Sequence, residues 1–270
     1  MDTANQRWIR YYGPPLTIPN IGDRLTKANV SWAWYAGGWA NAAGRKDSAG
    51  WTNGDGPTCS DAQASAAATY PNCPDTRFQF HHQPFNYFAA YGDDTAEHRA
   101  GRAAHLKDEA DFLADLKNRA LPAVSFVKPL GSENEHPGYG SEYEGDQHTV
   151  ALIRAIQADG VDWPSTVVVL TYDEFGGSAD HVAPPSAAPA ALVGRTPPGP
   201  RARTGPTADR WGPGTRIPAM ILSPLLPAVS GIDHTVYDTT SILATIERRF
   251  GLAPLADRDR AVADFGPLFR

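Results

Sequence analysis

The sequence has 270 residues, 41% of them hydrophobic, and a formal net charge of −6. This size is sufficient for one sizeable α/β core. Its 24 Lys and Arg residues are scattered, which argues against a nucleic-acid-binding protein. No apolar run approaches the ~20 residues of a membrane helix, so no transmembrane segment is predicted. Residues 1–10 lack the apolar centre of a signal peptide, and the location is left unknown.

The first half of the chain alternates between helical and strand patterns. A short helix is predicted over 21–28, and a strand over 30–36, where VSWAWYA alternates as strands do. Amphipathic helices are predicted over 104–118 and 145–158. Between them, LPAVSFV at 121–127 is a compact apolar run of strand length.

The second half contains the strongest predicted strand, TVVVLTY at 166–172. It is apolar throughout, as expected for a central parallel strand covered on both faces. A strand over 217–222 and a helix over 239–250, stopped by Gly251, follow. This order predicts an α/β fold, with a mostly parallel sheet sandwiched by helices. Ligands of such sheets bind at the carboxyl ends of the strands.

Two irregular segments are predicted within what we expect to be a single domain over 1–270. Residues 40–74 are rich in Gly, Ala, Ser, Asn and Asp and form an insertion, and residues 184–213 form a Pro-rich loop. Cys59 and Cys73 lie in the insertion. The two cysteines could form a disulfide if the protein is exported, or remain free thiols if it is cytoplasmic, and the sequence does not decide between these alternatives.

Carboxylates follow the strongest predicted strand. Asp173 and Glu174 come directly after it, and Gly176 and Gly177 allow a sharp turn beneath them. A carboxylate near a core is costly without a partner, and a divalent cation would offset that cost. The alternative is that both side chains face water or cap the next segment. His234, shortly before the last helix, is either a further metal ligand or an ordinary loop residue.

Histidines provide a second set of candidates. His136 follows the 121–127 strand, in the extended backbone that the next proline imposes. His81 and His82 lie in the aromatic segment FQFHHQPFNYF. Adjacent residues of an extended segment point to opposite faces, so one of the two could reach a site while the other packs. The alternatives are a surface position for His136 and packing within an aromatic cluster for one of the pair.

Several motifs of other enzyme classes are absent from the sequence. It contains no GxSxG elbow, no GxxxxGK[ST] phosphate loop and no HExxH or CxxC metal-binding spacing. A serine hydrolase, a kinase and a zincin are therefore poorly supported.

An ordered set of segments resembles the phosphoesterase family that includes bacterial acid phosphatases and non-haemolytic phospholipases C. Among them are IGDRLTKANVSWAWYAGGW, FQFHHQPFNYF, LPAVSFVKPLGSENEHPGYGS and TVVVLTYDEFGGSADHVAPP. The resemblance implies an alkaline-phosphatase-like α/β/α fold. It also implies hydrolysis of phosphate esters or phospholipids through a phospho-enzyme, with a divalent metal ion activating a Ser or Thr nucleophile.

The resemblance also assigns roles to the candidate residues. The residues that resemble metal ligands are Asp173, Glu174 and His234. The residues that resemble catalytic phosphate contacts or proton donors to the leaving oxygen are His136, His81 and His82.

The sequence departs from the family pattern at its N-terminal side. The Glu-Asn-x-Ser-Phe-Asp segment, which supplies the first metal ligands, and the nucleophile in a Pro-Asn-Arg-like context have no counterpart here. The resemblance therefore implies an N-terminally truncated chain, a missing N-terminal fragment and little activity of the chain alone. The alternatives are a non-catalytic metal- or phosphate-binding module and a phosphodiesterase that uses metal-bound water. Members of the family are often periplasmic or secreted.

Overall fold

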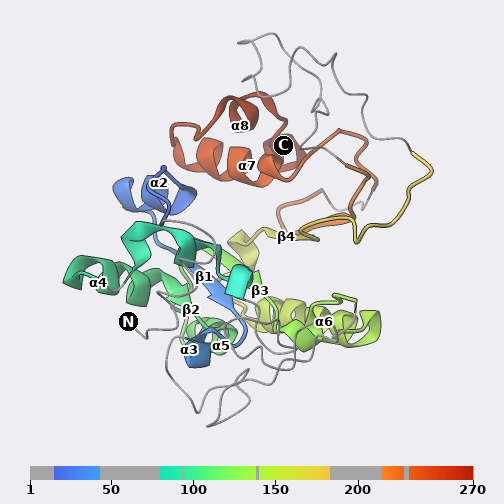
Figure 1. The fold of residues 1–270 in the computed structure, drawn as a ribbon. Helices are drawn as coiled ribbons and strands as arrows, with labels where there is room; N and C mark the ends of the chain where they lie inside the picture. The colour runs from blue at the N-terminus through green and yellow to red at the C-terminus, as the bar shows by residue number, and fades with distance from the viewer. Residues whose placement is uncertain are drawn as a thin grey trace. The chain divides into compact units, whose positions relative to one another are not determined.

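The structure is a computed structural model, and the residues that it describes are 15–42, 80–92, 94–137, 140–182, 214–227 and 231–269 (Figure 1). Nearly all of the predicted insertion 40–74, with Cys59 and Cys73, lies outside the described residues, as does the whole Pro-rich loop 184–213. No helix in the described ranges is long and apolar enough to cross a membrane.

The chain divides into two compact units, which are described separately. Unit 1 comprises residues 1–18 and 30–159, and unit 2 comprises residues 19–29 and 160–270. The helices and strands of unit 1 are α3 (Trp39–Ala42), α4 (Ala96–His105), α5 (Glu109–Lys117), α6 (Glu142–Ala158), β1 (Trp32–Ala36), β2 (Leu106–Lys107) and β3 (Val124–Lys128). Those of unit 2 are α2 (Ile21–Lys27), α7 (Thr240–Phe250), α8 (Asp257–Ala261), β4 (Val168–Thr171) and β5 (Ala219–Leu222).

Unit 1 is built on a three-stranded parallel sheet in the order β2-β1-β3. β1 is the central strand, and its register with β3 runs from Trp32↔Val124 to Ala36↔Lys128. The predicted α/β class is confirmed by this parallel sheet and the helices that pack on it.

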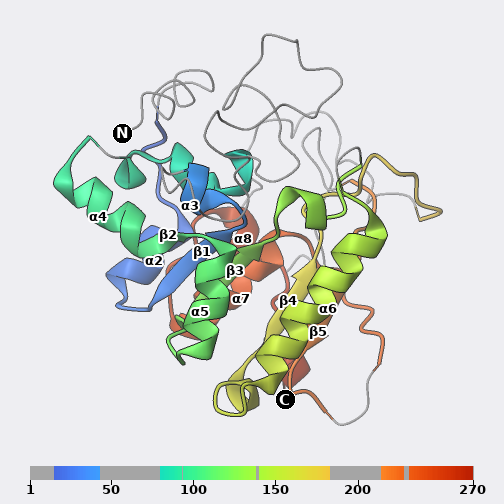
Figure 2. The ribbon, with the colours of Figure 1, turned by 90° about the horizontal axis from the view of Figure 1, so that it is seen from below.

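One face of the sheet is covered by two helices. Ala33 and Tyr35 point to this face, because alternate residues of a strand point to opposite sides. They form a buried cluster with Phe112 and Leu116 of α5, and Leu152 of α6 packs against the same cluster. Figure 2 shows α5 and α6 side by side on this face.

The opposite face of the sheet carries the two tryptophans of β1, Trp32 and Trp34. The ring of Trp32 lies 4.8 Å from that of Phe85 and stacks on that of His105, at 4.2 Å. Trp34 stacks on Phe126 of β3, at 5.1 Å. The segment around Phe85 forms three short 3₁₀ helices, η1 (Phe80–His82), η2 (Pro84–Tyr87) and η3 (Ala89–Tyr91). The predicted extended conformation of this segment is therefore wrong, since Pro84 begins a helical turn.

The single helix predicted over 104–118 is also wrong. Leu106 and Lys107 instead pair with β1 as an edge strand. Asp108 starts a new helix, because its side chain accepts a hydrogen bond from the N–H of Ala110 (3.1 Å). Its own N–H donates to Asp111 (2.9 Å), which completes a capping box.

In unit 2, the predicted central parallel strand is wrong. β4 pairs antiparallel with β5, in a two-stranded sheet with the register Val168↔Leu222 to Thr171↔Ala219. All four residues of β4 are half-buried rather than buried on both faces. A short apolar run predicts a strand but specifies neither its direction nor the number of its neighbours. The helix predicted over 239–250 is confirmed as α7, and Gly251 ends it in a left-handed conformation (φ 64°).

A pair of buried carboxyl groups joins α7 to α8. Glu247 is 1% exposed and Asp259 is 2% exposed. The N–H of Leu255 donates to both, at 3.0 Å to Glu247 and 2.8 Å to Asp259. Burial, together with a hydrogen bond to Asp259, raises the pKa of Glu247 from 4.5 to about 7.

This pair predicts a pH-dependent stability. Because the pKa of Glu247 is raised in the folded state, its contribution is present below the unfolded value of 4.5 and is lost as pH rises through about 7. In the unaltered protein, the free energy of unfolding should fall by up to about 3 kcal/mol as the pH rises from 4.5 to about 7. We expect Glu247→Gln to abolish this decrease, as measured by unfolding in urea. Glu97→Gln, at an exposed position of α4, is the matched control. An unchanged pH dependence in Glu247→Gln would contradict the assignment.

Candidate functional site

In unit 1, the adjacent histidines lie in η1, which is fixed to β1. The indole N–H of Trp34 donates to the carbonyl oxygen of His82 (2.7 Å), and the Gln83 side-chain amide donates to the carbonyl oxygen of Trp34 (3.3 Å). His82 is 6% exposed, whereas His81 is exposed, and their rings lie 4.6 Å apart. The structure therefore buries one histidine of the pair and presents the other to solvent.

His136 and Lys128 follow the neighbouring strand. Lys128 is the last residue of β3 and pairs with Ala36, at the carboxyl end of β1. The exposed His136 lies beyond the short helix η4 (Gly131–Glu133), and its N–H donates to the side-chain oxygen of Asn134 (3.1 Å). Its ring Nδ1 lies 2.7 Å from the carbonyl oxygen of Pro137. A carbonyl oxygen can only accept, so Nδ1 carries the proton and the neutral ring has its lone pair on Nε2.

Electrostatic interactions link these basic groups to one another. Burial lowers the pKa of His82, and the positive charges of Lys128, His81 and His136 lower it further, to about 2. Lys128, His81 and His136 thus lie near enough to His82 to affect its protonation. A cluster of imidazole and ammonium groups has the chemistry to bind an anion such as a phosphoryl group.

In unit 2, Asp173 and Glu174 follow β4 as exposed residues. The N–H of Gly176 donates to Glu174 Oε2 (2.7 Å). Gly176 and Gly177 have φ values of 66° and 71°, so the sharp turn predicted from the two glycines is confirmed.

The third predicted metal ligand, His234, is also exposed. Its neighbour Asp233 accepts hydrogen bonds from the hydroxyl of Tyr237 (2.6 Å) and the N–H of Thr235 (3.0 Å). The bond from Tyr237 is the main cause that lowers the pKa of Asp233. Within the described residues, His234 does not form a compact three-ligand group with Asp173 and Glu174.

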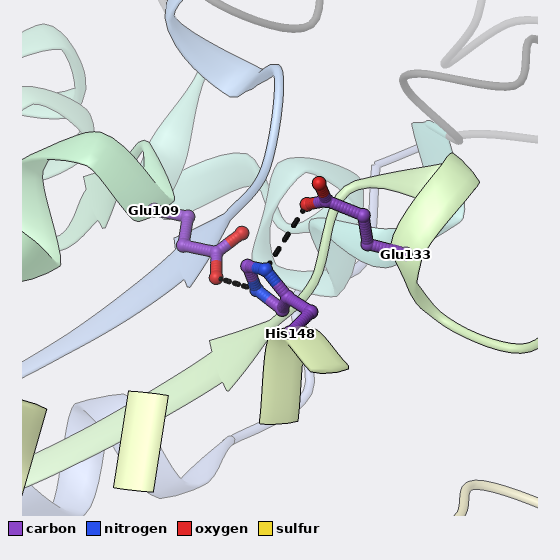
Figure 3. Close-up of side chains that lie close together, drawn as sticks. All are labelled: Glu109, Glu133 and His148. Carbon is purple, nitrogen blue, oxygen red and sulfur yellow. Dashed lines mark hydrogen bonds and ion pairs between the residues drawn. The ribbon is translucent and has the colours of Figure 1, made fainter. Parts of the chain in front are cut away.

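A group that the sequence did not predict lies in unit 1 (Figure 3). Glu109, Glu133 and His148 place one possible ligand atom each within 4.8 Å of one another. His148 Nε2 makes a short hydrogen bond to Glu109 Oε1, and Nδ1 lies 3.1 Å from Glu133 Oε2. Carboxylate oxygens and an imidazole are a composition able to hold a divalent metal ion.

The burial of this group differs among its members. The side chain of Glu109 is 8% exposed, that of His148 is 18% exposed, and that of Glu133 lies nearer to the surface. A pocket of about 380 Å³ adjoins the group and is lined by Ser132, Glu133, Tyr143, Glu144, Gln147 and His148. The sequence did not predict this group, because in the sequence each member resembles an ordinary charged or polar residue on the exposed side of a helix.

Comparisons with known proteins show the family of this chain. A model of the Phosphoesterase family matches residues 10–253. Phospholipase C B of Mycobacterium tuberculosis is 33% identical over 174 residues, which are 59% of this chain and 31% of that protein. The non-hemolytic phospholipase C of Pseudomonas aeruginosa is 31% identical over 152 residues, 51% of this chain and 21% of that protein. The matches with these two relatives thus cover a third or less of the length of each.

Non-specific phospholipase C6 of Arabidopsis thaliana is a more distant relative. It is 29% identical over 175 residues, which are 57% of this chain and 31% of that protein.

The environment of His82 generates a prediction about its protonation. Because burial, and to a lesser extent the charge of Lys128, disfavour the imidazolium, we expect the ring of His82 to stay neutral from about pH 4 to about pH 8. The measurement is the chemical shift of its ring C–H groups in an NMR titration, with the signals assigned by comparison with His82→Asn. A chemical-shift change that fits protonation of His82 within this range would contradict the burial described above.

Proposed function

Because the chain belongs to the phosphoesterase family, we propose that it supplies the phosphate- and metal-binding residues of a hydrolase that acts on phosphoric ester bonds. The names of its relatives, phospholipases C from bacteria and a plant, support a phosphoric ester as the substrate. The observation that carries the proposal is the family match over residues 10–253, together with the paired His81 and His82 held against Trp34 of β1.

In this proposal, the histidines divide the work at the phosphoryl group. His82, neutral and buried, contributes a fixed hydrogen bond. The exposed His81 and His136 contact the phosphoryl oxygens or protonate the leaving oxygen. Lys128 adds a positive charge that offsets the negative charge of the phosphoryl group.

The proposed metal ligands are Asp173 and Glu174, with His234 as a third. A divalent ion bound there would offset the negative charge of the two carboxylates and would supply Lewis-acid chemistry. Both carboxylates are open to solvent, and the bond from Gly176 uses one oxygen of Glu174. We further propose that the whole fold is alkaline-phosphatase-like. The finer choice between phosphomonoesters and phospholipids depends on loops that shape the pocket.

The metal assignment is tested by Asp173→Ala. Loss of one carboxylate ligand is expected to weaken binding of Mn²⁺ or Zn²⁺ by about tenfold or more, measured by titration calorimetry. Asp94→Ala removes an exposed carboxylate of unit 1 and should leave the affinity unchanged. Equal metal affinity in Asp173→Ala and the unaltered protein would overturn the assignment.

The proposed division between binding and turnover is tested with the purified chain 1–270. We expect metal-dependent binding of inorganic phosphate. We expect little hydrolysis of p-nitrophenyl phosphate or p-nitrophenylphosphorylcholine, because no residue of this sequence matches the context of the family nucleophile. Rapid metal-dependent turnover would contradict the expected lack of a nucleophile. Absence of phosphate binding would contradict the proposed function itself.

A further inference from the structure

His148 lies between carboxylates from two other elements. It projects from α6, whereas Glu109 is the first residue of α5 and Glu133 is the last residue of η4 (Figure 3). Each carboxylate approaches a different nitrogen of the ring, Glu109 at Nε2 and Glu133 at Nδ1. The imidazole therefore connects three elements that are separate in the sequence.

The two contacts differ in kind: the one with Glu109 is a hydrogen bond, whereas the one with Glu133 is an ion pair that requires a charged ring. An ionised carboxylate can only accept hydrogen bonds, and a neutral imidazole has a single N–H. Nε2 of His148 can donate to Glu109 in either charge state, but only the imidazolium also presents a positively charged N–H at Nδ1, the nitrogen that Glu133 approaches. The hydrogen bond to Glu109 raises the pKa of His148, burial opposes this, and the charges of Glu109 and Glu133 raise it further.

The loop that follows Glu133 is packed closely on α6 and leads to His136. Glu135 has a φ of 66°, which is uncommon for a residue with a side chain. An added Cβ at Gly145 of α6 would lie 2.1 Å from Cγ of Glu135, so the glycine permits this close approach. The N–H of Gly140 donates to the carbonyl oxygen of His136 (3.0 Å), which closes the loop.

We propose that His148 is a positioning residue, whose imidazolium holds Glu133, and with it the loop that carries His136, against α5 and α6. This inference rests on the proposed function, in which His136 contacts the phosphoryl group. His148 itself takes no part in the reaction and acts through Glu133.

A proton explains the group better than a metal ion does. The lone pairs of the two imidazole nitrogens point away from each other, so one cation cannot bind both. Here Glu109 and Glu133 approach different nitrogens, and a single cation at either nitrogen would leave the opposite carboxylate without its partner. The imidazolium satisfies both carboxylates at once.

The arrangement in which His148 holds Glu133 and the loop to His136, called the clamp below, has a defined pH dependence. The pKa of His148 is raised by folding, so the stabilisation is present below the unfolded value and is lost as pH rises through the folded value. The titratable groups that face His148 are Glu109 from α5 and Glu133 from η4. Glu144 and Tyr143 of α6 line the adjoining pocket.

The test compares His148→Gln, which removes the charge, with His148→Arg, which keeps a positive charge that does not titrate. The first readout, without any ligand, is the NMR signal of the His136 backbone N–H at about pH 6 and about pH 9. The second readout is the dissociation constant of inorganic phosphate. His98→Gln is the matched control, because His98 is also a helical histidine paired with a carboxylate, that of Asp94 (2.7 Å).

We expect both ring nitrogens of His148 to have the ¹⁵N shifts of an imidazolium at the lower pH. His148→Gln should shift the His136 signal and weaken phosphate binding by about tenfold at that pH, whereas His148→Arg should restore both at both pH values. Neutral-ring shifts, a His136 signal unchanged in His148→Gln, or stoichiometric Zn²⁺ binding that His148→Gln abolishes would each overturn the proposal. If the unaltered protein binds no phosphate, the proposed function fails, while the ligand-free His136 signal still decides whether the clamp exists.

Discussion

The parallel pairing of β1 with β3 is the constraint on which the basic cluster depends. Their register places Lys128 beside Ala36, so both strands end at the same edge of the sheet. The N–H of Gly37 donates to the carbonyl oxygen of Lys128 (3.0 Å), and an added Cβ at Gly37 would lie 2.5 Å from the nitrogen of Leu130. Only a glycine permits this close approach, and the loop to His136 starts from there.

The aromatic face of the same sheet determines what each histidine can do. Trp34 binds the backbone of His82, and the resulting burial makes the charged form of that ring unfavourable. A histidine in this position is suited to a constant hydrogen bond rather than to proton transfer. The proposed transfer of a proton to the leaving oxygen therefore falls to His81 and His136, which are exposed.

Local patterns predicted those parts of the fold that local physics decides. Alternation over VSWAWYA indicated β1, and the 3.6-residue period indicated α6 and α7, because burial of one face determines both signals. The same reasoning failed at Leu106, where pairing with β1 overrode a continuous helical pattern. It also failed for β4, because an apolar run carries no information about strand direction.

For the candidate site, the sequence predicted individual residues but not their grouping. His81 and His82 lie side by side in η1, with their rings 4.6 Å apart, and His136 follows β3 beyond η4, whereas their catalytic roles stay predictions. The group around His148 could not be found in this way. Its members come from helices whose packing is decided by buried residues such as Phe112, and not by the charged residues themselves.

The left-handed conformation of Glu135 gives a physical reason for the clamp. Such a conformation in a residue with a side chain costs on the order of 1 to 3 kcal/mol and persists only where surrounding contacts hold it. On one side of Glu135, Glu133 is held by His148, and on the other the backbone of His136 is held by Asn134 and Gly140. Removing the imidazolium would leave Glu109 buried without its partner, which is costly in itself. The stability of unit 1 and the position of His136 are therefore coupled through one side chain.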